Sequence, residues 1–405
     1  MTNVCLYFQV HQPYRVRRYT LFDIGKNSQY FDTEKNKEVL HKVAKKCYIP
    51  ATRVILDLIK KNPDFKVAYS ISGTAIEQFQ EHSPETLELF QELSDSDRVE
   101  FLNETYYHSL SALYDKDEFS QQVKQHQKIV KKLFGQKPTV FRNTELIYNN
   151  EIAKTVQSLG YKAILAEGWD GVLGWRSPNY VYKASGTKLN LLLKNYKLSD
   201  DIAFRFSDKK WNGWPLTTEK FASWVAPIPG DSVNLFMDYE TFGEHQWADT
   251  GIFNFLRHLP SALRKHNIGF SHPSELAAID AKDELDIHHP LSWADVERDT
   301  SAWLGNKMQQ SAASTIFKLK NEVLASGNAS LIDSWKKLTT SDHFYYMCTK
   351  WFNDGDVHKY FSPYETPYEA YIAYMNIVQD IQHQLKMSKP KLFSSFTKYL
   401  KEVSA

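Results

Sequence analysis

Residues 235–247 read LFMDYETFGEHQW, a short apolar run that changes abruptly into acidic, aromatic and imidazole side chains. The length and apolar composition of residues 233–237 predict a buried strand. Asp238, Glu240 and Glu244 cannot continue such a strand, because an unpaired ionised carboxylate is strongly disfavoured in a low-dielectric interior. The strand therefore ends near Asp238. A carboxylate at the carboxyl end of a strand is typical of the mouth of an α/β barrel, and an ordinary polar loop is the alternative.

Six further apolar stretches have the length of buried strands, and they cover residues 4–10, 66–71, 99–102, 138–141, 162–166 and 189–193. Segments with helical periodicity, such as residues 50–60 and 119–134, separate most of them. This alternation predicts βαβ units and a parallel sheet flanked by helices. No dinucleotide-binding glycine motif or Walker motif is present, so an open nucleotide-binding sheet is not indicated.

Polar clusters follow five of the predicted strands, which end at Val10, Leu102, Phe141, Ala166 and Met237. In a parallel barrel the carboxyl ends of all strands lie on one face. Five loops that are distant in the sequence should therefore line one mouth. This coincidence predicts an active site there.

The chain changes character after about residue 287. Helices are expected at residues 300–326, 331–340, 343–352 and 367–386. The predicted division is a catalytic barrel over residues 1–286 and a helical bundle domain over residues 287–405. No linker rich in Gly, Ser or Pro separates them, so the helical domain should pack on the barrel.

Composition excludes several classes of function. The chain has 405 residues and 49 basic against 48 acidic side chains, a balance that offers no bulk attraction for nucleic acid or an anionic membrane. Aromatic residues make up 14%, and their faces suit both core packing and stacking on sugars. Three cysteines without C-x-x-C spacing and no calcium-type loop predict neither disulfides nor a metal or other cofactor.

The N-terminus lacks the basic start and long apolar region of a signal peptide, and no apolar run approaches the roughly 20 residues of a membrane span. A cytoplasmic location is therefore expected. The sequence leaves the oligomeric state open.

Glu145 and Asp238 lie far apart in the chain, yet both follow strands and are predicted at the same mouth. Two carboxylates that face one bond are what glycoside hydrolysis requires. One attacks the anomeric carbon while the other protonates the leaving oxygen and then activates a water or an acceptor hydroxyl.

Five motifs carry a definite resemblance: HQP at 11–13, NETYYH at 103–108, FRNTELIYNN at 141–150, FMDYETFGEHQ at 236–246 and ERDTSAWLGN at 297–306. In this order and spacing they resemble the conserved regions of glycoside hydrolase family 57, most closely its α-amylase-type members. The likeness covers about residues 1–385. The second motif ends in Tyr107 and His108, where several members carry a carboxylate.

The resemblance implies an incomplete (β/α)7 barrel followed by a helical domain. It also implies action on α-1,4-glucans or maltooligosaccharides with retention, through a covalent glucosyl-enzyme intermediate. Glu145 would be the nucleophile and Asp238 the general acid/base. Ligands of sugar hydroxyls, or side chains that orient the catalytic pair, would be His11, Gln12, Glu104, His108, Arg142, Asn143, Glu240, His245 and Asp299. Trp169, Trp247 and Trp303 are candidate stacking platforms, with core packing as the alternative for each.

Three other functions compete with α-glucan hydrolysis. A 4-α-glucanotransferase or glucan-branching enzyme would use the same carboxylates, but the extensions seen in some such members are not evident. A metal-dependent deacetylase or α-mannosidase would favour an H-x-D pair on the first strand, where this chain has Pro13. A non-catalytic glucan-binding protein is not indicated, because both carboxylates are present.

Overall fold

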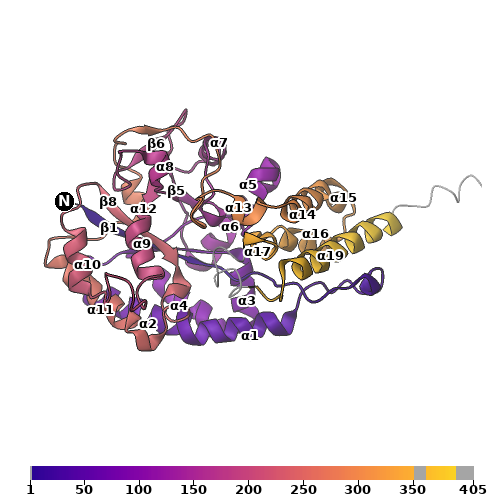
Figure 1. Ribbon diagram of the computed structural model, residues 1–405, viewed down its shortest axis with the longest axis horizontal. Coiled ribbons are helices and arrows are strands. Elements are labelled where there is room, and N and C mark those ends of the chain that lie inside the picture. Colours follow the sequence, from indigo (N-terminus) through magenta and orange to yellow (C-terminus); the bar gives the residue numbers. More distant parts are fainter. Residues whose placement is uncertain (1, 351–361, 389–405) are drawn as a thin grey trace, which may run out of the picture.

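The computed structural model describes residues 2–350 and 362–388 (Figure 1). Within these residues seven parallel strands form the barrel: β1 (Asn3–Val10), β2 (Val67–Ile71), β3 (Val99–Phe101), β4 (Val140–Arg142), β5 (Ala163–Glu167), β7 (Asn190–Lys194) and β8 (Ser232–Asp238). They agree with the seven predicted strands to within one or two residues at either end. The predicted incomplete (β/α)7 barrel is confirmed.

The barrel is made of two sheets, with strand orders β3-β2-β1-β8 and β4-β5-β7-β6-β9. A parallel bridge between Asn103 and Phe141 joins β3 to β4. On the other side, the backbone nitrogen of Asn195 donates to the oxygen of Asn234 at 2.9 Å, which ties the end of β7 to β8. Short strands β6 (Tyr182–Ala184) and β9 (Glu284–Leu285) extend the second sheet outside the barrel, and they are too brief for sequence periodicity to reveal.

The strands are buried on both faces, which explains their continuous apolar composition. Alternate residues separate the two faces. In β1, Leu6 and Phe8 face the surrounding helices, whereas Cys5 and Tyr7 pack inside the barrel with Phe236 of β8. The same alternation decides which residues reach the mouth from the inside.

Helices cover the outside of the barrel: α1 (Thr33–Val43), α2 (Ile49–Lys61), α3 (Gly73–His82), α4 (Pro84–Ser94), α5 (Ser111–Tyr114), α6 (Lys116–Phe134), α7 (Asn150–Ser158), α8 (Asp170–Leu173), α9 (Tyr196–Ala203), α10 (Thr218–Val225), α11 (Ile252–Arg264) and α12 (Pro273–Leu276). Local signals fix their ends. The Asp115 side chain accepts from the backbone nitrogens of Asp117 and Glu118 to begin α6, and Gly135 ends it at φ +68°.

The helical domain contains α13 (Ser301–Leu304), α14 (Lys307–Lys318), α15 (Lys320–Ala325), α16 (Ala329–Leu338), α17 (Ser341–Tyr345) and α19 (Pro367–Ser388). The single helix predicted over residues 300–326 is wrong. Asn306 interrupts it, because its side chain accepts from the backbone nitrogen of Gln309 and starts a new helix. The helix predicted over 343–352 ends at Tyr345 as α17, and residues 351–352 lie outside the described residues.

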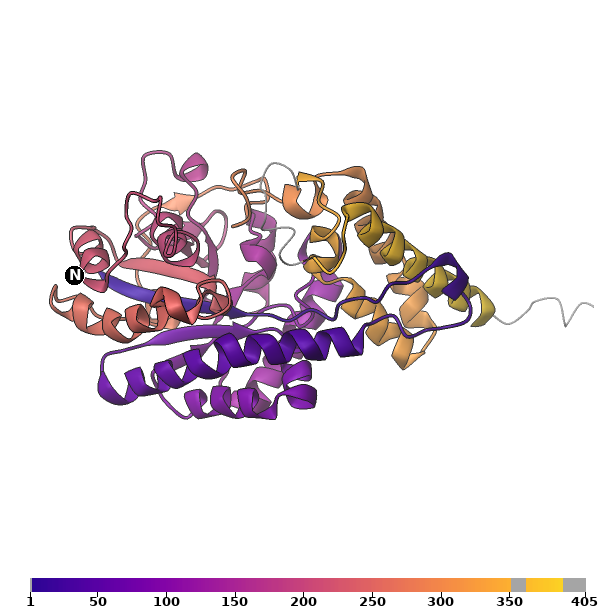
Figure 2. The same cartoon turned by 60° about the horizontal axis from the view of Figure 1, so that its bottom comes forward.

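The two parts of the chain share a hydrophobic core, in which Phe141 and Ile164 of the barrel pack with Trp335 and Ile377 of the helices. In Figure 2 the indigo segment after β1 runs out along the helical domain to α19. There Asp380 accepts hydrogen bonds from the Tyr30 hydroxyl and the Gly25 backbone nitrogen, each at 2.6 Å. We propose the division at 286/287 with the helical domain docked in this way; residues 389–405 lie outside the described part of the chain.

Among the described helices, none combines the length and the apolar composition that a bilayer crossing requires.

Candidate active site

Glu145 lies just after β4, in a 3-10 turn (Thr144–Leu146), with φ +58°. Leu146 and His108 also have positive φ values, both +50°. Left-handed backbone in residues other than glycine costs on the order of 1–3 kcal/mol each and persists only where the surroundings enforce it. Such strain at neighbouring positions marks this end of the barrel as a candidate functional site.

Three hydrogen-bond donors surround the Glu145 carboxylate, whose side chain is 18% exposed. Oε1 lies 3.3 Å from Nε2 of His108 and accepts from the Ser341 hydroxyl at 3.0 Å. Oε2 accepts from the indole Nε1 of Trp293 at 2.9 Å. Burial opposes ionisation, but the hydrogen bond and charge of His108, with the charge of Arg142, hold the pKa of Glu145 below its ordinary value. Glu145 is therefore kept anionic.

Asp238, the last residue of β8, has the opposite electrostatic situation. Burial, followed by repulsion from the Glu145 carboxylate, raises the pKa of Asp238 to about 6. Burial and the charge of Asp238 likewise raise the pKa of Glu240 to about 8, and Glu240 accepts a hydrogen bond from the Tyr48 hydroxyl. The pKa values of Glu145 and Asp238 are thus shifted in opposite directions. Two carboxyl groups with such separated pKa values are suited to the different roles of nucleophile and proton donor.

His108 is held as an imidazolium against the Glu145 carboxylate. Its Nδ1 lies 2.9 Å from Oε2 of Glu104. Glu104 is fully buried, and its other oxygen, Oε1, accepts from Gln9 Nε2 at 3.0 Å. Despite burial, which opposes both charges, this contact lowers the pKa of Glu104 to about 2, and the two glutamates raise the pKa of His108 to about 9. The His11 ring stacks on His108 at a centroid distance of 4.0 Å.

Glu104→Gln should therefore lower the free energy of unfolding by about 3 kcal/mol near pH 6, because the buried His108 cation loses the closer of its two carboxylate partners. The lowered pKa of Glu104 gives stability that is lost as pH falls toward about 2, and the raised pKa of His108 gives stability that is lost as pH rises through about 9. The difference between wild type and variant should shrink at both extremes. Urea unfolding at several pH values measures it, and a constant difference at every pH would contradict the pairing.

The helical domain contributes two side chains that sequence reasoning missed, Ser341 and Asp342 at the start of α17. Ser341 donates to Glu145, and its backbone nitrogen donates to the oxygen of His108 at 2.9 Å. Asp342 Oδ2 lies 3.0 Å from Nε2 of His11. Serine and aspartate at a helix start resemble an ordinary cap, so no local signal marks them as site residues.

Arg298 lies within the motif at 297–306, but the sequence did not predict it as a site residue. It donates to Glu167 and to Asp200, both at 3.1 Å, and its backbone φ is +53°. Lys194 joins the same buried network through Asp200 at 3.0 Å. The neighbouring Asp299 is exposed, and its carboxylate accepts from the backbone nitrogen and the hydroxyl of Ser301 rather than from Glu145 or Asp238.

Several predicted sugar ligands are too buried to reach a substrate and fit the orienting alternative. Arg142 is 0% exposed. Asn143 donates to the backbone oxygen of Ile147 at 2.8 Å and so braces the turn that carries Glu145. Gln12 donates to the Tyr48 hydroxyl at 2.9 Å. His245 is only half-buried, and its partial burial lowers its pKa to about 4.

The three predicted tryptophans differ in exposure. Trp303 does not fit the stacking role, because it is 2% exposed and packs in the core shared by barrel and helices. Trp169 is half-buried against the same core. Trp247 is 57% exposed, with the Lys46 ammonium 5.3 Å from its ring centroid. Within this set only Trp169 and Trp247 keep part of the ring exposed.

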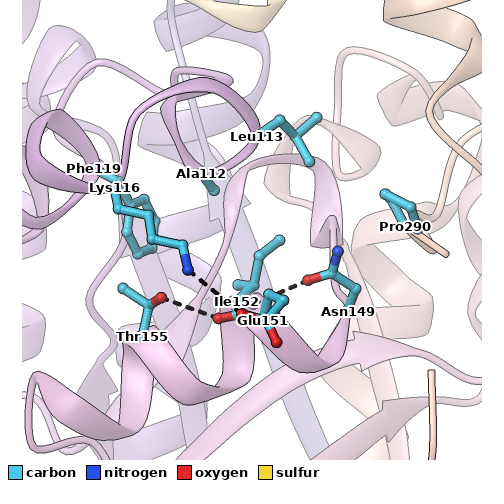
Figure 3. A pocket seen from close by; sticks show the side chains of 9 residues that line it. All are labelled: Ala112, Leu113, Lys116, Phe119, Asn149, Glu151, Ile152, Thr155 and Pro290. Atoms are coloured by element: carbon cyan, nitrogen blue, oxygen red, sulfur yellow. Dashed lines mark hydrogen bonds and ion pairs between the residues drawn. The ribbon is translucent and has the colours of Figure 1, made fainter. Parts of the chain in front are cut away.

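A cavity of about 320 Å³ lies between α5, the start of α6 and α7, and Figure 3 shows the side chains that line it. The Lys116 ammonium reaches the Glu151 carboxylate at 3.4 Å across it, and Asn149 caps α7. None of the predicted site residues lines this cavity. Among all described residues, including those around this cavity, no group of three or more His, Cys, Asp or Glu side chains is arranged to hold a metal ion.

The family model described as Glycosyl hydrolase family 57 matches residues 5–288. The chain belongs to glycoside hydrolase family 57. A protein of Methanocaldococcus jannaschii named "Putative alpha-amylase" is 45% identical over 397 residues, which cover 94% of this chain and 84% of that protein. The predicted family and the resemblance to its α-amylase-type members are confirmed.

Two solved structures share the fold, and the first is described as a family 57 enzyme. A branching enzyme of Thermococcus kodakaraensis superposes with a TM-score of 0.69 at 13% identity, covering 95% of this chain and 90% of the other. The α-amylase AmyC of Thermotoga maritima gives a TM-score of 0.60 at 10% identity, covering 98% and 96%. At such identities these similarities establish the fold alone.

Proposed function

We propose that this family 57 protein hydrolyses α-1,4-glucosidic bonds with retention, using Glu145 as nucleophile and Asp238 as general acid/base. The observation that carries the proposal is the opposite shift of the two pKa values, because the same buried site lowers the pKa of Glu145 and raises that of Asp238 to about 6. The motifs and the name of the 45% identical relative supply the substrate class.

In the first step an oxygen of Glu145 attacks the anomeric carbon, the glycosidic C–O bond breaks, and Asp238 transfers its proton to the leaving oxygen. In the second step the Asp238 carboxylate takes a proton from water, the water oxygen attacks the anomeric carbon, and the bond to Glu145 breaks. Both carboxyl groups return to their starting protonation states. His108, Ser341 and Trp293 keep the attacking carboxylate anionic and oriented.

Trp247 and Trp169 are proposed to stack on glucose rings, since Trp247 is exposed and Trp169 is only half-buried. The more exposed Trp247 should bind glucose units farther from the scissile bond. Six buried residues are proposed to orient the site: His108, Glu104, Arg142, Asn143, Gln12 and Glu240. The half-buried His245 is proposed to have the same role. His11, whose side chain is 12% exposed, is proposed to contact the sugar directly.

The dependence of kcat/KM on pH should be bell-shaped, with its maximum on the acid side of pH 6. Rates fall on the acid side as Glu145 becomes protonated, and its pKa lies below the ordinary 4.5. Rates fall on the alkaline side as Asp238 loses its proton around pH 6. Initial rates on maltoheptaose across this range measure both limbs. A rate that still rises above about pH 8 would exclude Asp238 as the proton donor.

A time course of products from maltoheptaose tests the proposed activity. Short maltooligosaccharides alone indicate hydrolysis, and proton NMR of the first product should show the α-anomer. Products longer than the substrate would instead identify a glucanotransferase, and new α-1,6 linkages a branching enzyme. Glucan binding without any turnover would overturn the catalytic proposal and indicate a binding protein.

A further inference from the structure

We propose that Trp293 is a positioning residue, whose single indole ring aims the Glu145 carboxylate and holds two barrel cations beside it. The proposal rests on the proposed role of Glu145 as the nucleophile. Trp293 lies in the connection between β9 and α13, outside the motifs that carry the family resemblance. It is half-buried against the residues that fill the barrel interior.

Trp293 binds Glu145 twice. The indole Nε1 donates to Oε2 of Glu145 at 2.9 Å, and the backbone nitrogen of Trp293 donates to the Glu145 backbone oxygen at 3.3 Å. The first contact fixes the carboxylate, while the second holds the turn in which Glu145 has its left-handed backbone. One residue thus restrains both the side chain and the main chain of the nucleophile.

The faces of the same ring attract cations. The Arg142 guanidinium carbon lies 4.7 Å and the Lys194 ammonium 5.5 Å from the ring centroid. Within the described residues no nitrogen of the Arg142 guanidinium has a hydrogen-bond partner, although Arg142 is 0% exposed. Burying such a charge without hydrogen bonds is costly, and contact with an indole face offsets part of that cost. The ring therefore keeps a positive charge near the catalytic carboxylates.

The loop holds Trp293 rigidly in this place. Arg298 donates to the backbone oxygen of Trp293, and its backbone oxygen accepts from Ser292 at 2.9 Å. Arg298 is itself anchored on the buried carboxylates of Glu167 and Asp200. Because this network holds the Trp293 ring in place, its indole N–H can act as a fixed hydrogen-bond donor. Orientation of a nucleophile requires such a donor.

The charged groups that face Glu145 come from every neighbouring element: His108 after β3, Arg142 in β4, Asp238 in β8 and Asp342 in α17. Removal of the indole N–H leaves all four in place. A change in the titration of Glu145 in Trp293→Phe therefore reports the lost hydrogen bond, because a hydrogen bond to the ionised form lowers the pKa of a carboxyl group.

The test compares Trp293→Phe and Trp293→Leu with wild type, and Trp175→Phe serves as control because Trp175 is 93% exposed. Trp293→Phe keeps an aromatic face but loses the N–H, whereas Trp293→Leu loses both. We expect kcat on maltoheptaose to fall about 10- to 100-fold in Trp293→Phe, and the acid limb of the pH profile to move up by about one unit.

A second measurement needs no substrate. Carbon-13 NMR of protein labelled in the glutamate carboxyl groups, with the Glu145 signal assigned through Glu145→Gln, follows the titration of Glu145 directly. Its midpoint should rise in Trp293→Phe and stay unchanged in Trp175→Phe. An unchanged midpoint in Trp293→Phe would overturn the positioning role, whereas a wild type inactive on glucans would overturn only the proposed function.

The contribution of the ring face is tested by thermal unfolding. Trp293→Leu should have a lower Tm than Trp293→Phe, because Arg142 then loses its aromatic contact while remaining buried. Equal Tm values for the two variants would show that the ring does not hold the guanidinium.

Discussion

Glu145→Gln should lower the turnover of maltoheptaose by about 10⁴-fold or more while leaving glucan binding nearly unchanged. The amide has almost the shape of the carboxylate but cannot form the glucosyl-enzyme bond at a useful rate. Binding should persist because the exposed Trp247 and the other proposed sugar contacts are untouched. Product analysis gives the rate, and calorimetric titration with maltoheptaose gives the affinity.

Glu88→Gln is the matched control, because Glu88 lies on the exposed face of α4 and the same chemical change there should leave activity unaltered. A Glu145→Gln variant with more than about a tenth of the wild-type rate would exclude Glu145 as the nucleophile. Loss of folding is checked by circular dichroism, since Glu145 accepts three hydrogen bonds that the amide only partly retains.

Asp238→Asn should slow hydrolysis by about 10²- to 10⁴-fold, the usual contribution of a general acid/base. The loss should be smallest for aryl maltooligosaccharides with acidic leaving groups, which need little protonation. The alkaline limb of the pH profile should also disappear, because it reports the pKa of Asp238 near 6. Initial rates on glucan and aryl substrates across the pH range measure both effects.

Asp97→Asn, at a carboxylate that is 88% exposed, should behave as wild type. An Asp238→Asn variant that is impaired equally on all leaving groups and keeps its alkaline limb would assign proton transfer to another residue. Glu240 would then be the first to examine, since its pKa is raised to about 8 and it lies two residues further along the chain.

The parallel strands could be predicted because burial on both faces forces a continuous apolar run. β8 illustrates this, since its apolar residues stop where the polar loop after Asp238 begins. The helical region was harder to predict. Residues 300–326 have helical periodicity, but Asn306 gains a side-chain hydrogen bond by breaking the helix, and local competition of this kind outweighs a periodic pattern.

The positions of Asp238 at the end of β8 and of Glu145 just after β4 could be predicted, but their neighbours from distant segments could not. The Ser341 contact with Glu145 spans 196 positions and the Trp293 contact 148. Neither residue type nor spacing signals such contacts, because they arise only when the helical domain docks on the barrel. Conversely, Trp303 looked like a stacking platform although the fold buries it in the shared core.

The sequence by itself determined the barrel, its carboxyl-end mouth and the two carboxylates, because strand burial and chain order are properties of local pattern. The tertiary structure alone decided the electrostatic environment of Glu145 and Asp238. The pKa values of these two carboxyl groups depend on burial, on the Glu104–His108 pair and on the cations around Trp293, and different segments of the chain supply these groups. A pKa depends on the distances between groups rather than on their order in the chain.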